Sequence, residues 1–103
     1  MAKPGYVYIL ASQRNGTLYI GVTSNLIQRA HQHREGTVDG FSSKYGVRRL
    51  VHFEAFDDIT DATQREKVLK KWRRAWKLEL IEESNPEWDD LYPAITGFPL
   101  SRE

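Results

Sequence analysis

The side chains best suited to chemistry are two phenols, a guanidinium, an imidazole and a carboxylate: Tyr8, Tyr19, Arg29, His33 and Glu66. The tyrosines stand eleven positions apart, the arginine follows ten positions later, and the histidine four positions after that. Such groups can bind an anion, hold a hard cation or move a proton. The sequence has no cysteine, which excludes a thiol nucleophile, a thiolate zinc site and disulfides.

The two tyrosines lie in segments that predict a β-hairpin. Residues 6–12 and 17–23 are rich in β-branched and aromatic side chains, as strands usually are. Asn15-Gly16 between them favours a two-residue type I′ turn, which needs positive φ at both positions. With that turn, the numbers of paired residues sum to 31.

Side-chain alternation then gives the hairpin two different faces. One face is wholly apolar: Val7, Ile9, Ala11, Leu18, Ile20 and Val22. The other face holds Tyr8 and Tyr19. We expect this second face to lie outside the core and to form the floor of a site.

Helix signals flank a third predicted strand. Ser24 and Asn25 supply N-cap oxygens, and Gly36 supplies a C-terminal stop, for a helix over 26–35, which would carry Arg29 and His33 on one side. The stretch 36–46 is predicted to be a loop, and 47–56 a third strand.

A long helix is predicted over 61–83, begun by Thr60 or Asp61 and ended by Asn85-Pro86. Its expected core-facing stripe recurs at steps of three and four residues: Leu69, Trp72, Trp76 and Leu80. These elements predict an α+β domain over 1–95, with a small three-stranded antiparallel sheet flanked by helices. Residues 96–103 are expected to be a loosely ordered tail.

Composition fits a folded domain without a membrane anchor. The chain has 103 residues, 40% of them hydrophobic, and a net charge of +1, which is ordinary for a globular domain. The apolar run 7–11 is too short for a signal peptide or a membrane span. We therefore expect a soluble protein of the reducing cytoplasm.

The motifs together resemble those of the GIY-YIG nuclease superfamily. Tyr6-Val7-Tyr8 and Tyr19-Ile20-Gly21 stand where the family has its two name-giving tripeptides, and Arg29, His33, Glu66 and Asn85 follow in the family's order. The resemblance covers about residues 5–92. It is greatest to small stand-alone bacterial members and to the N-terminal nuclease domain of the excinuclease of nucleotide-excision repair. Tyr6 occupies the position of the family's first glycine, which adds bulk to this face.

The resemblance implies a divalent-metal-dependent endonuclease acting in DNA repair or recombination. Glu66 would hold Mg²⁺ or Mn²⁺, and Arg29 would stabilise the transition state. Tyr8 and Tyr19 would position or activate water. A phenol with a pKa of about 10 is only roughly 0.1% ionised at pH 7, so we expect the tyrosines to act with the metal or the arginine rather than as free bases.

Two further residues complete the predicted catalytic set. His33 is an alternative proton acceptor or phosphate donor. Asn85 either positions Glu66 or fixes the helix end against the sheet.

DNA is favoured over RNA as the partner. The predicted nucleic-acid contacts are four basic residues: Lys44, Lys70, Arg73 and Lys77. The stretch 65–77 holds seven lysines or arginines, whereas 82–90 holds five acids and no base, so the small net charge hides two opposite surfaces.

Two other functions remain open on these residues. One is a nucleic-acid-binding module with little or no catalytic turnover. The other is a protein-interaction adaptor that uses the acidic 82–90 segment and the aromatic side chains. Oligomeric state is not determined by any of these features.

Overall fold

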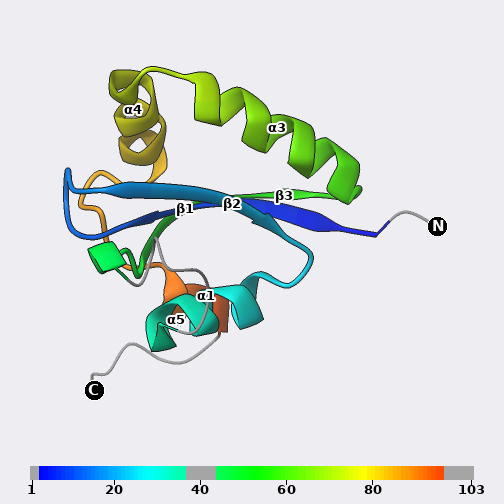
Figure 1. Cartoon of the computed structure of the whole chain (residues 1–103), viewed down its shortest axis with the longest axis horizontal. Helices are drawn as coiled ribbons and strands as arrows, with labels where there is room; N and C mark the ends of the chain where they lie inside the picture. The colour runs from blue at the N-terminus through cyan, green and yellow to red at the C-terminus, as the bar shows by residue number, and fades with distance from the viewer. Residues whose placement is uncertain (1–2, 37–43, 97–103) are drawn as a thin grey trace.

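The computed structural model describes residues 3–36 and 44–96. Its sheet has the strand order β2-β1-β3 and is antiparallel throughout, with β1 at Gly5–Ala11, β2 at Leu18–Thr23 and β3 at Arg49–Phe56. The helices are α1 Leu26–Glu35, α3 Ile59–Lys71, α4 Arg74–Ser84 and α5 Tyr92–Thr96. Figure 1 shows α3 and α4 on one face of the sheet, and α1 and α5 on the other. The predicted α+β fold with a three-stranded antiparallel sheet is confirmed.

The turn between β1 and β2 is longer than the two residues predicted. The backbone N–H of Ser12 donates to the carbonyl of Thr17 at 3.0 Å, which leaves four residues in the turn. Asn15 has a φ of 60°, but Gly16 lacks the positive φ that a type I′ turn requires. The predicted turn type is therefore wrong.

The longer turn moves the register of the hairpin by two residues. Tyr8 pairs with Gly21, whereas the two-residue turn would have paired it with Thr23. Because the shift is even, every side chain remains on its predicted face. Tyr8 and Tyr19 do share a face, as predicted.

Both faces of the sheet are covered. The face toward α3 and α4 carries an apolar core: Val7, Ile9, Ala11, Ile20, Val51, Ala62, Leu69, Ile81 and Trp88. The face toward α1 and α5 carries a second core: Tyr8, Leu10, Leu26, Val47 and Leu50. The expectation that the tyrosine face lies outside the core is therefore wrong, because α1 and α5 pack on it.

Strand β3 contains an irregularity that its uneven sequence pattern reflects. Ile9 pairs with His52 and Leu10 pairs with Leu50, so Val51 is an extra residue on β3. Such a bulge interrupts the alternation of side chains. Val51 accordingly joins the core on the α3 side.

Of the two predicted N-cap residues, Asn25 is the one that caps α1, and Gly36 ends the helix as predicted. The side chain of Asn25 accepts from the N–H of Gln28 at 3.1 Å, and Gly36 ends the helix with a left-handed φ of 74°. Residues 37–43 of the predicted loop lie outside the described residues.

The long helix predicted over 61–83 is two helices instead. Asp58, rather than Thr60 or Asp61, caps the first helix, and Trp72 and Arg73 are both extended and separate α3 from α4. After this break, Arg74 donates to two carbonyls of the β1–β2 turn, at 2.8 and 2.6 Å. Tertiary contacts thus override a helical pattern that contains neither proline nor glycine.

The break also changes which tryptophans are buried. Trp76 is 47% exposed, so its predicted core position is wrong, whereas Trp88, after α4, is fully buried. The indole N–H of Trp88 donates to Glu82 at 2.7 Å. Trp88 has a positive φ of 58°, which is unusual for a bulky residue.

The C-terminal end of the described chain is the short helix α5. Thr96 is its last residue, and its hydroxyl donates to the carbonyl of Tyr92 at 3.0 Å. The rest of the predicted tail, 97–103, lies outside the described residues. Within residues 3–36 and 44–96, no helix has the length and apolar character needed to cross a membrane.

Candidate active site

Three rings gather on the α1 side of the sheet. The ring centres of Tyr8 and Tyr19 are 6.3 Å apart, with an angle of 28° between the planes. His33 reaches in from α1, and its ring centre lies 5.7 Å from that of Tyr8 and 5.2 Å from that of Tyr19. We call Tyr8, Tyr19 and His33 the ring cluster. It brings together three residues of the predicted catalytic set.

The ring cluster is closed on its Tyr8 side. Tyr8 is 1% exposed and His33 is fully buried, and the Tyr8 hydroxyl shares a 3.2 Å hydrogen bond with Nε2 of His33. Tyr19 lies on the edge strand and is half-buried. Of the two tyrosines, Tyr19 is therefore the more accessible to solvent.

Gly21 makes room for the Tyr8 phenol. A Cβ at Gly21 would lie 2.5 Å from the Tyr8 hydroxyl oxygen and 2.6 Å from Cζ. Any side chain would push the ring out of place, so the glycine is needed for close approach. The sequence placed Gly21 on this face, but only the corrected register makes it the direct partner of Tyr8.

Arg29 lies one helical turn before His33 on α1. It is half-buried, and residues four apart lie on one side of a helix. Arg29 is thus on the same side of the sheet as the ring cluster. This agrees with the predicted grouping of Arg29 and His33.

Glu66 lies on the other side of the sheet. It belongs to α3, which packs on the apolar core that contains Leu69. Its Oε2 is 3.1 Å from Nζ of Lys70, and the side chains of Glu66 and Lys70 are 16% and 54% exposed. The predicted metal ligand is therefore not a member of the ring cluster.

A pocket lies between β2 and the helices α3 and α4. It has a volume of ≈ 290 Å³, and its lining comes from β2, α3 and α4: Leu18, Tyr19, Ile20, Lys70 and Lys77. Three consecutive residues of β2 line it, and β2 is an edge strand of the sheet. We call this the edge pocket. Tyr19 belongs to it and to the ring cluster.

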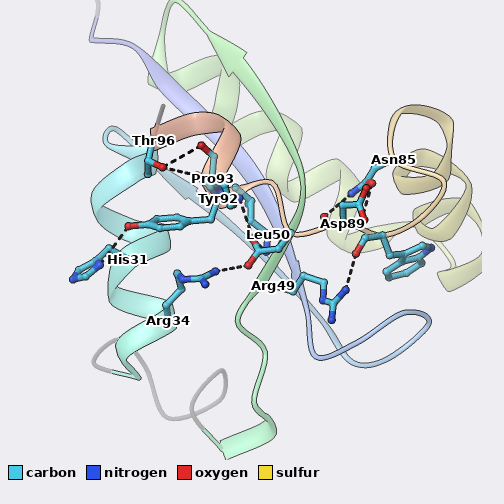
Figure 2. Close-up of polar contacts among 11 residues, drawn as sticks. His31, Arg34, Arg49, Leu50, Asn85, Asp89, Tyr92, Pro93 and Thr96 are labelled. Carbon is cyan, nitrogen blue, oxygen red and sulfur yellow. Dashed lines mark hydrogen bonds and ion pairs between the residues drawn. The ribbon is translucent and has the colours of Figure 1, made fainter. Parts of the chain in front are cut away.

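Asn85 occupies a structural position at the end of α4. Its Nδ2 donates to the carbonyls of Val51 at 3.1 Å and Asp89 at 2.9 Å, and its Oδ1 accepts from the N–H of Asp89 at 3.0 Å. Figure 2 shows the contact between Asn85 and Asp89. Between the two predicted roles, the geometry favours fixing the helix end against the sheet.

The four predicted nucleic-acid contacts are not one stripe. Lys70 and Lys77 line the edge pocket. Arg73 lies at the helix break with its guanidinium 4.8 Å from the centre of the Trp76 ring. Lys44 precedes β3, 5.5 Å from the centre of its neighbour's ring.

Among the described residues, the predicted ligand for a divalent cation is one carboxylate, that of Glu66, and not a cluster of ligands. Within residues 3–36 and 44–96, no three acidic or histidine side chains gather into a metal-binding group. A hard cation such as Mg²⁺ often takes one or two protein carboxylates and keeps water and phosphate as its other ligands. Glu66, partly exposed, fits that limited role.

An ionic cluster on the other flank of α3 was missed by the sequence interpretation. Arg65 donates to both carboxylate oxygens of Glu54, at 2.9 and 3.1 Å, and His52 Nε2 lies 2.9 Å from the same carboxylate. The hydrogen bond with His52, and then the Arg65 guanidinium, lower the pKa of Glu54 from its usual 4.5 to about 2, although burial raises it. The cluster ties α3 to β3.

Helix α5 is held against α1 by polar contacts. Arg34 pairs with Asp90, and its guanidinium lies 4.6 Å from the centre of the Tyr92 ring. The Tyr92 hydroxyl is 3.5 Å from Nδ1 of His31, as Figure 2 shows. These contacts hold α5 against α1, and both helices pack on the face of the sheet that carries the ring cluster. Alternating sequence patterns do not reveal them.

Comparison with known proteins agrees with this arrangement. The family model of the GIY-YIG catalytic domain matches residues 4–79. The chain belongs to the GIY-YIG catalytic-domain family, which is nuclease-like and acts on nucleic acid.

Within that family, the chain is similar to UPF0213 proteins. The one from Syntrophus aciditrophicus is 41% identical over 86 residues, which cover 80% of this chain and 93% of that protein. One from Clostridium perfringens is 40% identical over 76 residues, 74% of this chain and 81% of that one. The solution NMR structure of a UPF0213 protein from Bacillus halodurans matches with a TM-score of 0.54 and 27% identity, over 87% of this chain and 95% of that one.

Proposed function

We propose that this protein hydrolyses phosphodiester bonds in DNA at a composite site around the edge of β2. The observation that carries the proposal is the double membership of Tyr19. It stacks in the ring cluster on one side and lines the edge pocket with Lys70 and Lys77 on the other. The edge pocket is lined by Tyr19 and by two residues with ammonium groups, a setting suited to a phosphodiester.

Each catalytic residue has a separate task in this proposal. Glu66 holds Mg²⁺ or Mn²⁺, which supplies positive charge opposite the phosphate oxygens. Arg29 donates to the non-bridging oxygens through its planar fork as negative charge grows on them. Tyr19 orients the attacking water through its hydroxyl. Lys70 and Lys77 attract the backbone on either side of the scissile phosphate.

Tyr8 and His33 act behind Tyr19. Because Tyr8 is 1% exposed, it is a positioning residue that fixes the imidazole through their shared hydrogen bond. His33 in turn packs against Tyr19, where it can accept a proton. Asn85 contributes by holding α4, and with it Lys77, against the sheet.

Cleavage assays with a matched pair of variants test the proposal. Purified protein is incubated with single-stranded, duplex and branched DNA in Mg²⁺ or Mn²⁺. Glu66→Gln should lower the rate by about 10²-fold or more, as loss of a charge-stabilising group does. Glu79→Gln, an exposed acid on α4, should leave the rate unchanged. A wild-type protein no faster than Glu66→Gln on every DNA, and on RNA, would contradict the proposal.

A nucleic-acid-binding module without turnover is the second candidate. It is supported by the burial of Tyr8 and by the ion pair that occupies the Glu66 carboxylate. Its signature is salt-sensitive DNA binding that survives Glu66→Ala and Arg29→Ala, with no cleavage by the wild type.

The adaptor alternative has less support from the geometry. Within the acidic 82–90 segment, Glu82 accepts from Trp88, and Asp90 pairs with Arg34 and accepts from the N–H of Leu50 at 3.3 Å. These two acids make internal contacts, which leaves Glu83, Glu87 and Asp89 as the exposed acids of the segment without a role in holding Trp88 or Arg34.

A further inference from the structure

Helix α3 directs different charged side chains toward the two outer strands, β3 and β2. Arg65 reaches Glu54 on β3, whereas Lys70, the partner of Glu66, lines the edge pocket with residues of β2. Neighbouring helix positions differ by about 100° in direction, which explains how Arg65 and Glu66 serve opposite flanks. The β2 flank of α3 therefore carries Lys70, which lines the edge pocket, and Glu66, which reaches that pocket's edge through its ion pair with Lys70.

The Glu66–Lys70 ion pair is one that can open easily. Nζ and Oε2 are 3.1 Å apart, but the Lys70 side chain is 54% exposed. An i,i+4 pair of this kind contributes only about 0.3–0.5 kcal/mol, and the lysine stem is flexible. Glu66, at 16% exposed, is the more fixed partner.

Lys70 has a second place to go. Because it lines the same pocket as Tyr19, its ammonium group can reach an anion at the β2 edge as well as the carboxylate. The carboxylate and the anion are both negatively charged, and one ammonium group cannot pair fully with both at once. A divalent cation on Glu66 would take the carboxylate and repel the ammonium group toward the pocket.

We propose that Lys70 is an exchangeable counter-ion of the site. It neutralises Glu66 before a cation arrives, and it moves to a nucleic-acid phosphate in the edge pocket when the cation binds. This inference rests on the proposed function, since it takes Glu66 as the cation ligand and the edge pocket as the phosphate site. It makes cation and nucleic acid bind cooperatively, and such coupling is reciprocal.

The two ligands should then respond to loss of Lys70 in opposite directions. Removing the competing ammonium group tightens cation binding, and removing the phosphate contact weakens nucleic-acid binding. A lysine that only stabilises the helix would change neither affinity. A lysine that only contacts phosphate would weaken nucleic-acid binding without tightening the cation. Lys77 is the matched control, because it lines the same pocket while the ion pair of Glu66 is with Lys70.

Cation binding is measured first, by calorimetric titration of the folded protein with Mn²⁺ in the absence of nucleic acid. Lys70→Met should bind Mn²⁺ about 2-fold more tightly than wild type, the factor that corresponds to the energy of an exposed i,i+4 ion pair. Lys77→Met should bind it within about 1.5-fold of wild type, and Glu66→Gln should lose the site. Circular dichroism establishes that each variant is folded.

Nucleic-acid binding is measured next, by fluorescence anisotropy with a labelled phosphorothioate single strand that resists cleavage. Mn²⁺ should raise the affinity of wild type and Lys77→Met, and should raise that of Lys70→Met clearly less, because the cation still attracts the strand but no ammonium group is released to it. In Mn²⁺, Lys70→Met should also reduce the slope of log K against log salt by about 0.7, the value for one lost phosphate contact.

The outcomes separate this inference from the proposed function. If Lys70→Met binds Mn²⁺ no more tightly than Lys77→Met while Glu66→Gln loses the site, the counter-ion exchange is wrong and Glu66 remains the cation ligand. If Glu66→Gln binds Mn²⁺ as wild type does, the proposed cation site itself fails. Tighter Mn²⁺ binding by Lys70→Met together with a smaller Mn²⁺ effect on the strand supports the exchange.

Discussion

The two faces of the sheet bury different kinds of side chain. The α3 face is apolar at its centre, with Leu69, Ile81 and Trp88, and its charges lie at the flanks. The α1 face has polar atoms at its centre, where Tyr8 and His33 share a buried hydrogen bond. An apolar centre favours stability, whereas a buried polar pair needs defined partners and orients side chains.

The difference suggests a division of work within a small domain. The α3 face supplies most of the apolar burial, and the α1 face holds aromatic groups in fixed positions. The edge strand β2 has side chains on both faces, and our proposal places the chemistry at this strand. Substitutions on the two faces should therefore have different consequences.

The largest expected effect is on the α3 face, at Trp88. Trp88→Ala removes a fully buried indole and should lower the free energy of unfolding by about 3–5 kcal/mol. Chemical denaturation measures this change. A loss below about 1.5 kcal/mol would show that the apolar face is not the main source of stability.

The backbone of Trp88 provides a control for that experiment. Its φ of 58° favours glycine over alanine, so Trp88→Gly should be more stable than Trp88→Ala by about 1 kcal/mol. The opposite order would mean that the backbone relaxes once the indole is gone.

The next largest effect tests the α1 face at Gly21. Gly21→Ala places a methyl group against the Tyr8 phenol and should cost about 1–3 kcal/mol of stability by overpacking. It should also shift the ring resonances of Tyr8 and Tyr19 in NMR spectra. In a Tyr8→Leu background the same substitution should cost clearly less, because the clash is gone. Equal costs in both backgrounds would argue against the close approach.

The smallest effect concerns the charged flank of the α3 face and depends on pH. The pKa of Glu54 is lowered from 4.5 to about 2 in the folded protein, so its stabilisation is complete above pH 4.5 and is lost as pH falls toward 2. Glu54→Gln should be less stable than wild type by about 1–2 kcal/mol at pH 7.

Denaturation at a series of pH values tests this window. The gap between wild type and Glu54→Gln should narrow below pH 4.5, in line with the lowered pKa. Glu87→Gln is the control, since Glu87 is 73% exposed and lies 4.0 Å from Arg14. A gap that stays constant between pH 6 and 3 would contradict the role of the Glu54 charge.

Much of the fold could be predicted because strand alternation is tolerant of some errors. The predicted turn was two residues too short, yet Tyr8 and Tyr19 stayed on one face because the error was even. The caps of α1 were also readable, since Asn25 and Gly36 act through local bonds. Local signals of this kind do not depend on distant parts of the chain.

Features set by distant contacts could not be predicted. The helix break at Trp72 depends on where α4 docks, as the bonds of Arg74 to the hairpin turn show. The burial of Trp88 and the exposure of Trp76 follow from that break. The periodic spacing of apolar residues alone does not reveal this break.

The candidate site was only partly predictable for the same reason. The spacing of Arg29 and His33 places them on one side of α1, and His33 does meet both tyrosines. The sequence does not tell that α1 covers Tyr8 or that Glu66 approaches from the opposite face of the sheet. Both depend on the way the helices divide between the two faces.

The central claim is that the ring cluster and Glu66 form one site around the edge of β2. Its most direct test is NMR of the folded protein with substoichiometric Mn²⁺, which broadens resonances near the bound ion. We expect the ring signals of Tyr19 and His33 to broaden in wild type and to remain sharp in Glu66→Gln. Mn²⁺ that binds through Glu66 while the Tyr19 signals stay sharp would contradict the claim.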